Sequence, residues 1–146
     1  MWNASLMPEN YSILLADDHV SLRKGLISIL EQSHEFKVAG EAGNGNELLD
    51  LLNGGVVPDV LILDISMPEL SGIEVLRRIR QMHFVFKVLI LTMHKEPDFL
   101  KQALSAGANG YMLKDELANE LLPALHTLLE DKTYFSPSIS KELADF

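Results

Sequence analysis

Residues 60–72 read VLILDISMPELSG, an apolar run that ends on a single acid, Asp64, and continues into a Met-Pro turn. Four apolar residues in a row, with no polar alternation, are typical of a strand buried on both faces of a parallel sheet. A second run of this kind, KVLILT, occupies residues 87–92. The two runs predict two central strands, and the position of Asp64 at the end of one of them raises the question of its role.

Apolar runs and helical patterns alternate along the rest of the chain. Strands are predicted at 11–16, 36–42, 60–64, 87–92 and 110–114, and each is followed by leucine or isoleucine at helical spacing. Ser71 and Glu74 have the spacing of a capping box, while Pro97 and Gly107 suit the beginning and end of another helix. Five strand–helix units in a row predict an α/β fold with a doubly wound, five-stranded parallel sheet, the flavodoxin-like (βα)5 arrangement.

Length and charge limit the function classes. The 146 residues suit one domain, and 21 Asp and Glu against 12 Lys and Arg give a net charge of −9, which opposes unspecific binding to nucleic acid. The dense basic cluster RRIR (77–80) is too short for a nucleic-acid patch. The absence of cysteine excludes disulfides and thiolate chemistry. No apolar run has membrane-spanning length and the first ten residues do not resemble a secretory signal, so we expect a cytoplasmic location.

Chemically active side chains gather at the predicted carboxyl ends of the strands. Asp17 and Asp18 follow the first strand, Asp64 ends the third, Thr92 ends the fourth and Lys114 ends the fifth. Taken singly, each has an ordinary interpretation as a cap, a turn residue, a strand residue or a solvated lysine. In an open parallel sheet, however, ligands bind at this edge, so the combination predicts a functional site.

The three acids of this set would repel one another unless a cation lay among them. Mg²⁺ suits such a set, because it usually takes one or two protein carboxylates and keeps several waters. The remaining carboxylate is then available for chemistry, and an aspartate can accept a phosphoryl group as an acyl phosphate. A metal, an ammonium and a hydroxyl are the groups that phosphoryl transfer requires around the moving oxygens.

The motifs, in this order, resemble the receiver domain of bacterial two-component response regulators over about residues 11–130. The resemblance implies that Asp64 in LILDISMP is the phosphoacceptor and that Lys114 in GYMLKD pairs with the phosphoryl group. It also implies that Thr92 in LILTMH is the switch hydroxyl and that Tyr111 is an aromatic that changes rotamer on activation. The implied Mg²⁺ ligands are Asp17, Asp18, Asp64 and the backbone carbonyl of Ser66.

The segments ILLADDHVSLRKGL, GEAGNG and HKEPDFLKQALSAGANGYMLKD are similar to the NarL/FixJ (LuxR-type) group. This similarity implies a signalling domain rather than an enzyme, phosphorylated by a sensor histidine kinase, dimerising on phosphorylation and regulating transcription through a DNA-binding output domain. The expected organisation is an N-terminal extension (1–10), a receiver (11–130) and the start of an interdomain linker (131–146). The sequence contains no helix-turn-helix, so DNA binding would require a C-terminal domain outside it. A stand-alone receiver that acts through protein–protein contacts is the alternative.

Two positions depart from the commonest receiver pattern. Asp115 follows Lys114 where many receivers have proline, and Ser66 is smaller than the usual residue two positions beyond the acceptor. Ser66 and His94 lie where side chains affect hydrolysis of the acyl phosphate, so its lifetime is left open. His19, beside the acid pair, is a candidate contact for the kinase.

Three rival functions conflict with the residues at this site. A haloacid-dehalogenase-like phosphohydrolase needs an acid two positions after the nucleophile, where Ser66 stands. A flavodoxin-like cofactor module needs a phosphate-binding loop where Asp17, Asp18 and His19 stand. A pseudo-receiver that signals without phosphorylation is disfavoured by the intact set of acids, threonine and lysine.

Overall fold

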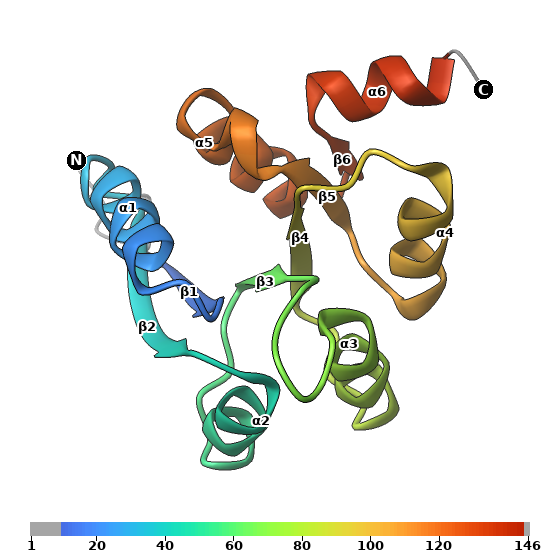
Figure 1. The fold of residues 1–146 in the computed structure, drawn as a ribbon. Helices are drawn as coiled ribbons and strands as arrows, with labels where there is room; N and C mark the ends of the chain where they lie inside the picture. The colour runs from blue at the N-terminus through green and yellow to red at the C-terminus, as the bar shows by residue number, and fades with distance from the viewer. Residues whose placement is uncertain (1–9, 145–146) are drawn as a thin grey trace.

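A computed structural model of the chain describes residues 10–144 and contains one parallel sheet with helices on both faces (Figure 1). The order of the strands across the sheet is β2-β1-β3-β4-β5-β6. The strands are β1 (Tyr11–Ala16), β2 (Phe36–Ala42), β3 (Val60–Asp64), β4 (Lys87–Thr92), β5 (Gly110–Leu113) and β6 (Tyr134–Phe135). The helices are α1 (Val20–Glu31), α2 (Gly45–Asn53), α3 (Gly72–Gln81), α4 (Pro97–Ala106), α5 (Leu117–Leu129) and α6 (Pro137–Ala144).

The predicted α/β class and doubly wound parallel sheet are confirmed, but the strand count is wrong. The sheet has six strands rather than five, because β6 pairs with the outer edge of β5 through Gly110 with Tyr134 and Tyr111 with Phe135. A two-residue strand is too short to leave a periodic pattern in the sequence. β5 also ends one residue earlier than predicted, and Lys114 begins a 3₁₀ turn (Lys114–Glu116).

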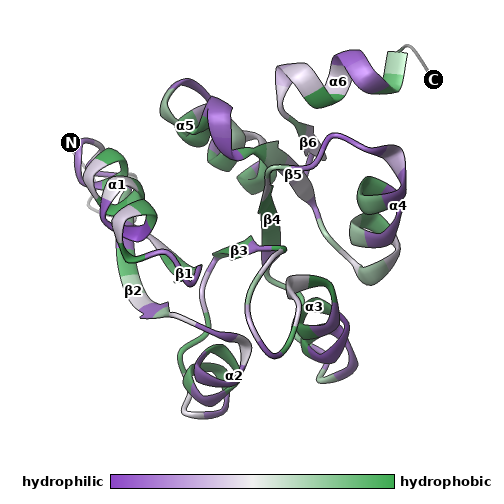
Figure 2. Ribbon diagram, in the orientation of Figure 1, coloured by the Kyte–Doolittle hydropathy of each residue, from purple (hydrophilic) through white to green (hydrophobic). Residues whose placement is uncertain are grey.

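Alternate residues of the strands face two separate apolar layers. Leu14, Leu61 and Ile90 pack with α2, α3 and α4, whereas Ile62 and Leu89 pack with α1 and α5 on the other face. Every residue of β3 and every residue of β4 after Lys87 is buried, as the apolar runs predicted, and Figure 2 shows the hydrophobic colour of β4 at the middle of the sheet. Within residues 10–144, no helix combines the length and the apolarity needed to cross a bilayer.

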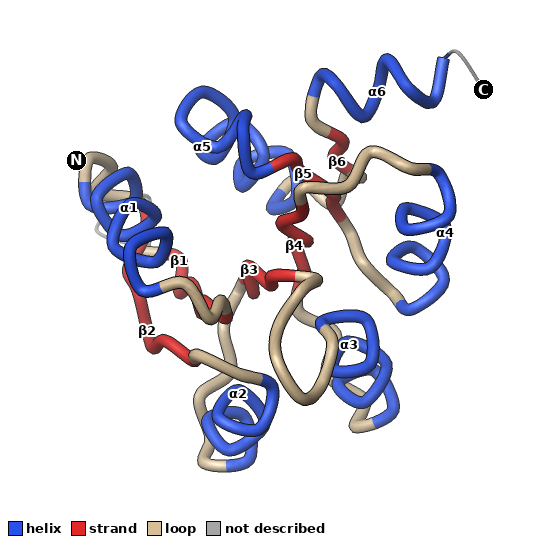
Figure 3. Tube along the Cα trace, viewed as in Figure 1, coloured by secondary structure: helices blue, strands red, loops and turns tan. Residues whose placement is uncertain are grey.

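Because β1 and β3 are neighbours in the sheet, their carboxyl ends, which carry the acids, lie side by side. The chain passes from β1 outward to β2 and then returns to β3 on the other side of β1, so the order reverses between β1 and β3. Ala16 is level with Leu63, and Asp64 is level with Leu91. Loops then leave β1, β3 and β4 at the same edge (Figure 3). This reversal is where open parallel sheets bind ligands.

The predicted helix signals act locally as expected. Ser71 is the N-cap of α3, and its Oγ accepts a hydrogen bond from the Glu74 amide at 3.3 Å. Pro97 is the first residue of α4, and Gly107 ends that helix in the left-handed region with φ of 107°. Because L side chains rarely adopt this conformation, glycine suits the position.

At the other end of the strands, Arg80 in the last turn of α3 binds several backbone carbonyls. Its guanidinium donates to the carbonyls of Phe84 (2.9 Å), Phe86 (2.8 Å) and Gly107 (2.8 and 3.2 Å), and to Oδ1 of Asn109 (3.0 Å). A Cβ on Gly107 would lie only 2.8 Å from Arg80 Cγ. Arg80 therefore joins α3, the beginning of β4 and the turn between α4 and β5.

The segment expected to begin a linker is folded against the sheet in its described part. Ser136 is fully buried, and Ile139 of α6 is 1% exposed in the same apolar layer as Tyr111. Figure 1 shows α6 extending from the β6 edge of the sheet. The role of residues 131–146 as a connection to another domain stays a prediction.

Candidate functional site

Asp17 and Asp64 are buried carboxylates at neighbouring strand ends, with 1% and 0% of their surface exposed. One oxygen of each is fixed by the turn that follows it. Asp64 Oδ1 accepts from the Ser66 amide at 3.0 Å, and Asp17 Oδ1 accepts from the His19 amide at 2.8 Å. Because each carboxylate is held by a backbone amide, its orientation is fixed, and the position of its second oxygen is fixed with it.

The second oxygens of these carboxylates are under-bonded. Apart from the Lys114 ammonium, no residue between 10 and 144 donates to Asp17 Oδ2 or Asp64 Oδ2. The ammonium of Lys114, whose side chain is 12% exposed, lies 3.2 Å from Asp64 Oδ2 and 3.5 Å from Asp17 Oδ2. One cation is thus shared by two buried acids, which leaves negative charge uncompensated.

A small hard cation fits this arrangement. One ligand atom from each of Asp17, Asp18, His19 and Asp64 lies within 4.8 Å of all the others. The His19 Nδ1 atom is 3.1 Å from Asp17 Oδ1 and 3.2 Å from Asp18 Oδ1. Buried carboxylate oxygens without donors are the ligands that Mg²⁺ prefers, so the residues present suit that ion.

The electrostatics of Asp64 favour the neutral carboxyl. Burial raises the pKa of Asp64 above its ordinary value, and the neighbouring charge of Asp17 raises it further. The hydrogen bond from the Ser66 amide and the charge of Lys114 lower the pKa but do not cancel the effect of burial. The ionised form of Asp64 is therefore held at an energetic cost that a bound cation would reduce.

The predicted switch residues form a second group beside the acids. Thr92 is fully buried, and its Oγ1 accepts from the His94 amide at 2.9 Å. The Tyr111 hydroxyl donates to the His94 carbonyl at 3.1 Å, and burial raises the pKa of Tyr111. The His94 ring stacks on Phe99 with centroids 4.2 Å apart. Thr92 and Tyr111 thus meet through the His94 backbone, and Tyr111 already lies inward.

Ser66 is exposed in the loop after β3. Its amide bonds Asp64, whereas its carbonyl stays a predicted metal ligand. The site thus brings together Asp17, Asp18, Asp64 and Lys114, with Thr92 and Tyr111 alongside.

Two residues that position the acids were missed by sequence reasoning. A Cβ on Gly72 would overlap the Asp64 carbonyl oxygen and lie 2.8 Å from Ile65 Cα, so only glycine lets α3 approach the acceptor loop. Arg23 of α1 donates to the Asp17 carbonyl and, through Nε, to Glu41 Oε1 at 3.2 Å. The glycine directly after the Ser71 cap was the available signal for the first; none marked the second.

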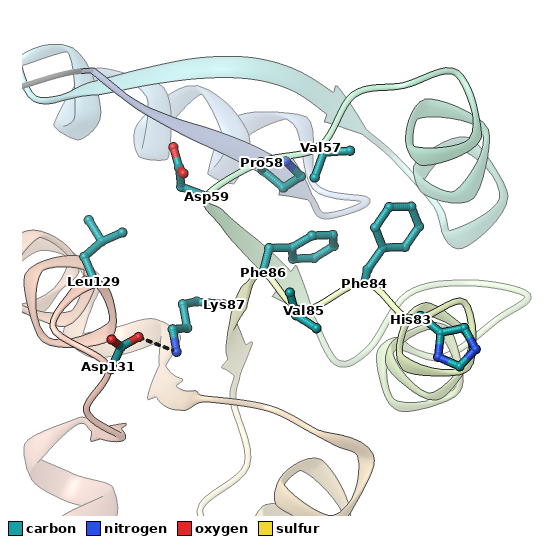
Figure 4. Close-up of a pocket in the computed structure, with 10 residues that line it drawn as sticks. All are labelled: Val57, Pro58, Asp59, His83, Phe84, Val85, Phe86, Lys87, Leu129 and Asp131. Carbon is teal, nitrogen blue, oxygen red and sulfur yellow. Dashed lines mark ion pairs between the residues drawn. The ribbon is translucent and has the colours of Figure 1, made fainter.

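A separate pocket lies at the other end of the strands (Figure 4). Phe84, Phe86 and Val57 line it, and the ion pair of Lys87 Nζ with Asp131 Oδ1, at 2.9 Å, lies at its side. Asp59, also in its lining, accepts from the Ser12 amide at 2.7 Å, so these charged side chains have partners. The under-bonded acids therefore lie at the carboxyl ends of the strands and not in this pocket.

Comparisons with known proteins point to one family. Residues 13–126 match the family model described as a response regulator receiver domain. The nitrate/nitrite response regulator protein NarL of Escherichia coli strain K12 is 32% identical over 136 residues, which cover 93% of this chain and 62% of NarL.

Solved structures give the same result. A two-component response regulator of the LuxR family from Aurantimonas sp. SI85-9A1 is 34% identical, with a TM-score of 0.88 over 94% of this chain and 97% of that one. A structure of two RcsB dimers bound to two parallel DNAs is 29% identical, with a TM-score of 0.85 over 93% of this chain and 69% of that chain. The chain spans about six-tenths of the length of the first curated relatives that it matches.

Proposed function

The chain belongs to the response regulator receiver family, and from this premise we propose that Asp64 accepts a phosphoryl group from a histidine of a partner sensor kinase. The observation that carries the proposal is the state of Asp64 Oδ2. It belongs to a fully buried carboxylate, and the Lys114 ammonium at 3.2 Å is its only polar partner among residues 10–144. An oxygen so placed is free to form a new bond beside a fixed positive charge.

In the proposed transfer, Asp64 Oδ2 attacks the phosphorus of the donor phosphoimidazole. The new O–P bond forms as the N–P bond breaks, and the departing imidazole nitrogen keeps the electron pair and takes a proton from solvent. Ser66 holds Oδ1 still during the attack, while Lys114 neutralises charge on the phosphoryl oxygens. Mg²⁺ held by Asp17, Asp18, Asp64 and the Ser66 carbonyl would supply further charge neutralisation when bound.

The proposed product alters the Thr92 group. An aspartyl phosphate adds strong acceptor oxygens and a charge of roughly −2. Thr92 Oγ1, which accepts from the His94 amide, would turn to donate to these oxygens and release that amide. Because the His94 carbonyl holds the Tyr111 hydroxyl, the change would shift populations of the surface formed by α4, β5 and α5.

For the whole protein, we propose transcription regulation through a DNA-binding domain beyond this chain, with dimerisation on phosphorylation. Support comes from the NarL-type relatives and from the structure of RcsB dimers bound to DNA. The net charge of −9 makes the receiver itself a poor partner for DNA phosphates. In this scheme residues 131–146 lead toward the output domain.

The test is the intact mass of the chain after exposure to acetyl phosphate, with and without Mg²⁺. The expected result is a Mg²⁺-dependent gain of one phosphoryl group in the wild type and in Asp50→Asn, an exposed acid on α2. Asp64→Asn should gain none and should remain folded by circular dichroism. A phosphoryl group on Asp64→Asn, or none on the wild type, would contradict the proposal.

A further inference from the structure

We propose that Ser136, in the connection between β6 and α6, is a positioning residue that holds Lys114 at the phosphoacceptor. The inference rests on the proposed function of Asp64. Ser136 followed by Pro137 looks in the sequence like a simple break before a linker. In the structure it is one of the few fully buried polar residues, and the other three, Asp17, Asp64 and Thr92, belong to the site already described.

Ser136 makes two hydrogen bonds to the outer edge of β5. Its Oγ accepts from the Leu113 amide at 3.1 Å, and its own amide donates to the Tyr111 carbonyl at 3.1 Å. The two-residue strand β6 ends just before Ser136, so the serine side chain replaces a backbone acceptor that a longer strand would have provided. Without the hydroxyl, the buried Leu113 amide would have no partner on that side.

Leu113 is the residue directly before Lys114, so its position decides where the lysine side chain starts. Lys114 Nζ must reach Asp64 Oδ2 and Asp17 Oδ2, on β3 and after β1, from the far side of β4. A small displacement at the end of β5 is carried along the whole lysine side chain. Because phosphoryl transfer depends mainly on positioned charge, such a displacement lowers the rate.

Further contacts tie the same segment to both sides of Lys114. The Ser138 amide donates to Glu116 Oε1 at 3.1 Å, in the turn that Lys114 begins, and the Tyr134 hydroxyl donates to Glu120 Oε1 at 2.8 Å. Ile139 packs in the apolar layer that contains Tyr111. Because these contacts join the β6–α6 segment to the residues on both sides of Lys114, a ligand that holds Lys114 in place should also slow local opening of that segment.

The first experiment compares Ser136→Ala with Ser136→Thr, which keeps the hydroxyl, and with Ser140→Ala, an exposed serine of α6. The rate constant for phosphorylation is measured at saturating acetyl phosphate and Mg²⁺, well below each unfolding midpoint. We expect Ser136→Ala to be slower by roughly 3–10-fold. The Mg²⁺ dissociation constant should stay within about twofold, because the ligands Asp17, Asp18 and Asp64 follow or end β1 and β3, whereas Ser136 is bonded to β5. Ser136→Thr should recover most of the rate, and Ser140→Ala should equal the wild type.

Equal rates for Ser136→Ala and wild type, with only the unfolding midpoint lowered, would reduce Ser136 to a structural role and overturn the inference. If the wild type gains no phosphoryl group at all, the proposed function fails and the inference fails with it. The two results are distinct, since the first occurs in a protein that is phosphorylated normally.

A second measurement needs no variant at Ser136. Amide hydrogen exchange of the wild type is compared with and without Mg²⁺ and beryllium fluoride, a mimic of the aspartyl phosphate. Coupling predicts slower exchange of the Leu113 and Ser136 amides, by roughly threefold or more. The Asn109 amide, bonded to the Val88 carbonyl at the other end of β5, should not change. Unchanged exchange at Leu113 would overturn the inference even if Ser136→Ala does not fold.

Discussion

Arg80 is half-buried and Asp64 is fully buried, and the two charged groups lie at opposite ends of the strands with opposite bonding. Five hydrogen bonds satisfy the Arg80 guanidinium with carbonyls and with Asn109. Asp64 accepts one, from the Ser66 amide, and its second oxygen contacts only the Lys114 ammonium among residues 10–144. The Arg80 guanidinium is satisfied within the protein, whereas the second oxygen of Asp64 can still accept further bonds.

Burial disfavours the charged form of both groups, so the difference between them lies in their hydrogen bonds. It lowers the pKa of Arg80 and raises the pKa of Asp64, so each group is shifted toward its neutral form. At Arg80 the hydrogen bonds offset that cost. At Asp64 they do not, and the residual cost should be measurable as lost stability.

The largest expected effect is at Arg80. Arg80→Met should lower the free energy of unfolding by roughly 3 kcal/mol, because the carbonyls of Phe84, Phe86 and Gly107 lose the donors of the guanidinium. Urea denaturation measures the change. Arg77→Met, on the same helix with half of its side chain exposed, should change stability by less than about 0.5 kcal/mol. An equal loss of unfolding free energy in Arg80→Met and Arg77→Met would contradict the special role of the Arg80 hydrogen bonds.

Asp64→Asn should have the opposite sign. Without divalent ions it should raise the free energy of unfolding by roughly 1–2 kcal/mol, because it removes a desolvated charge beside Asp17 while keeping an oxygen for the Ser66 amide. The measurement is the unfolding midpoint in chelator, with Asp50→Asn as the exposed control. A destabilised Asp64→Asn would indicate that the ion pair with Lys114 outweighs the burial of the charge.

The stabilisation by Asp64→Asn should depend on pH. Since burial raises the folded-state pKa of Asp64 above the ordinary 3.8, the folded carboxyl binds its proton more tightly than the unfolded one. The stability gained in this way is complete below pH 3.8 and is lost as pH rises through the folded-state pKa. The midpoints of variant and wild type should therefore differ most near pH 7.5 and converge toward pH 4. A constant difference would contradict the raised pKa.

The smallest expected effect is that of Mg²⁺. At about ten times its dissociation constant, Mg²⁺ should stabilise the wild type by roughly 1.4 kcal/mol, because it binds the folded state alone. Asp17→Asn should lose most of this gain, whereas Arg77→Met should keep it. Thermal unfolding across a MgCl₂ series, with KCl matched for ionic strength, tests the difference. An equal response in Asp17→Asn would place the ion elsewhere.

The sequence predicted the site around Asp64 better than the contacts of Arg80. Buried strands leave long apolar runs, and the residue that ends each run is known once the run is found, so Asp17, Asp64 and Thr92 could be placed. Arg80 was hidden in the cluster RRIR, where only its position four residues after Leu76 marks the inward face. Four of its five hydrogen bonds go to backbone carbonyls, which no residue type reveals.

The features that the sequence did not predict depend on contacts between residues that are far apart in the chain. β6 spans two residues, too few for an alternating pattern, and the hydrogen bonds of Tyr134 and Ser136 that join it to β5 cannot be read from residue types. Gly72 is required by the approach of α3 to the Asp64 carbonyl, a long-range contact that a local sequence pattern does not contain. Tyr111 could be named as a candidate, but its inward position follows from packing and its bond to His94.

The short strand β6 also determines how the protein can be handled. It covers the outer edge of β5 with only two paired residues and is followed at once by Ser136 and Pro137, so it offers little backbone for another chain to extend. A chain cut after residue 130 would uncover the apolar strand GYML, with the Leu113 amide and the Tyr111 carbonyl unpaired. Such an edge invites strand addition between molecules, so shortening the protein to its five strand–helix units would favour aggregation during expression and storage.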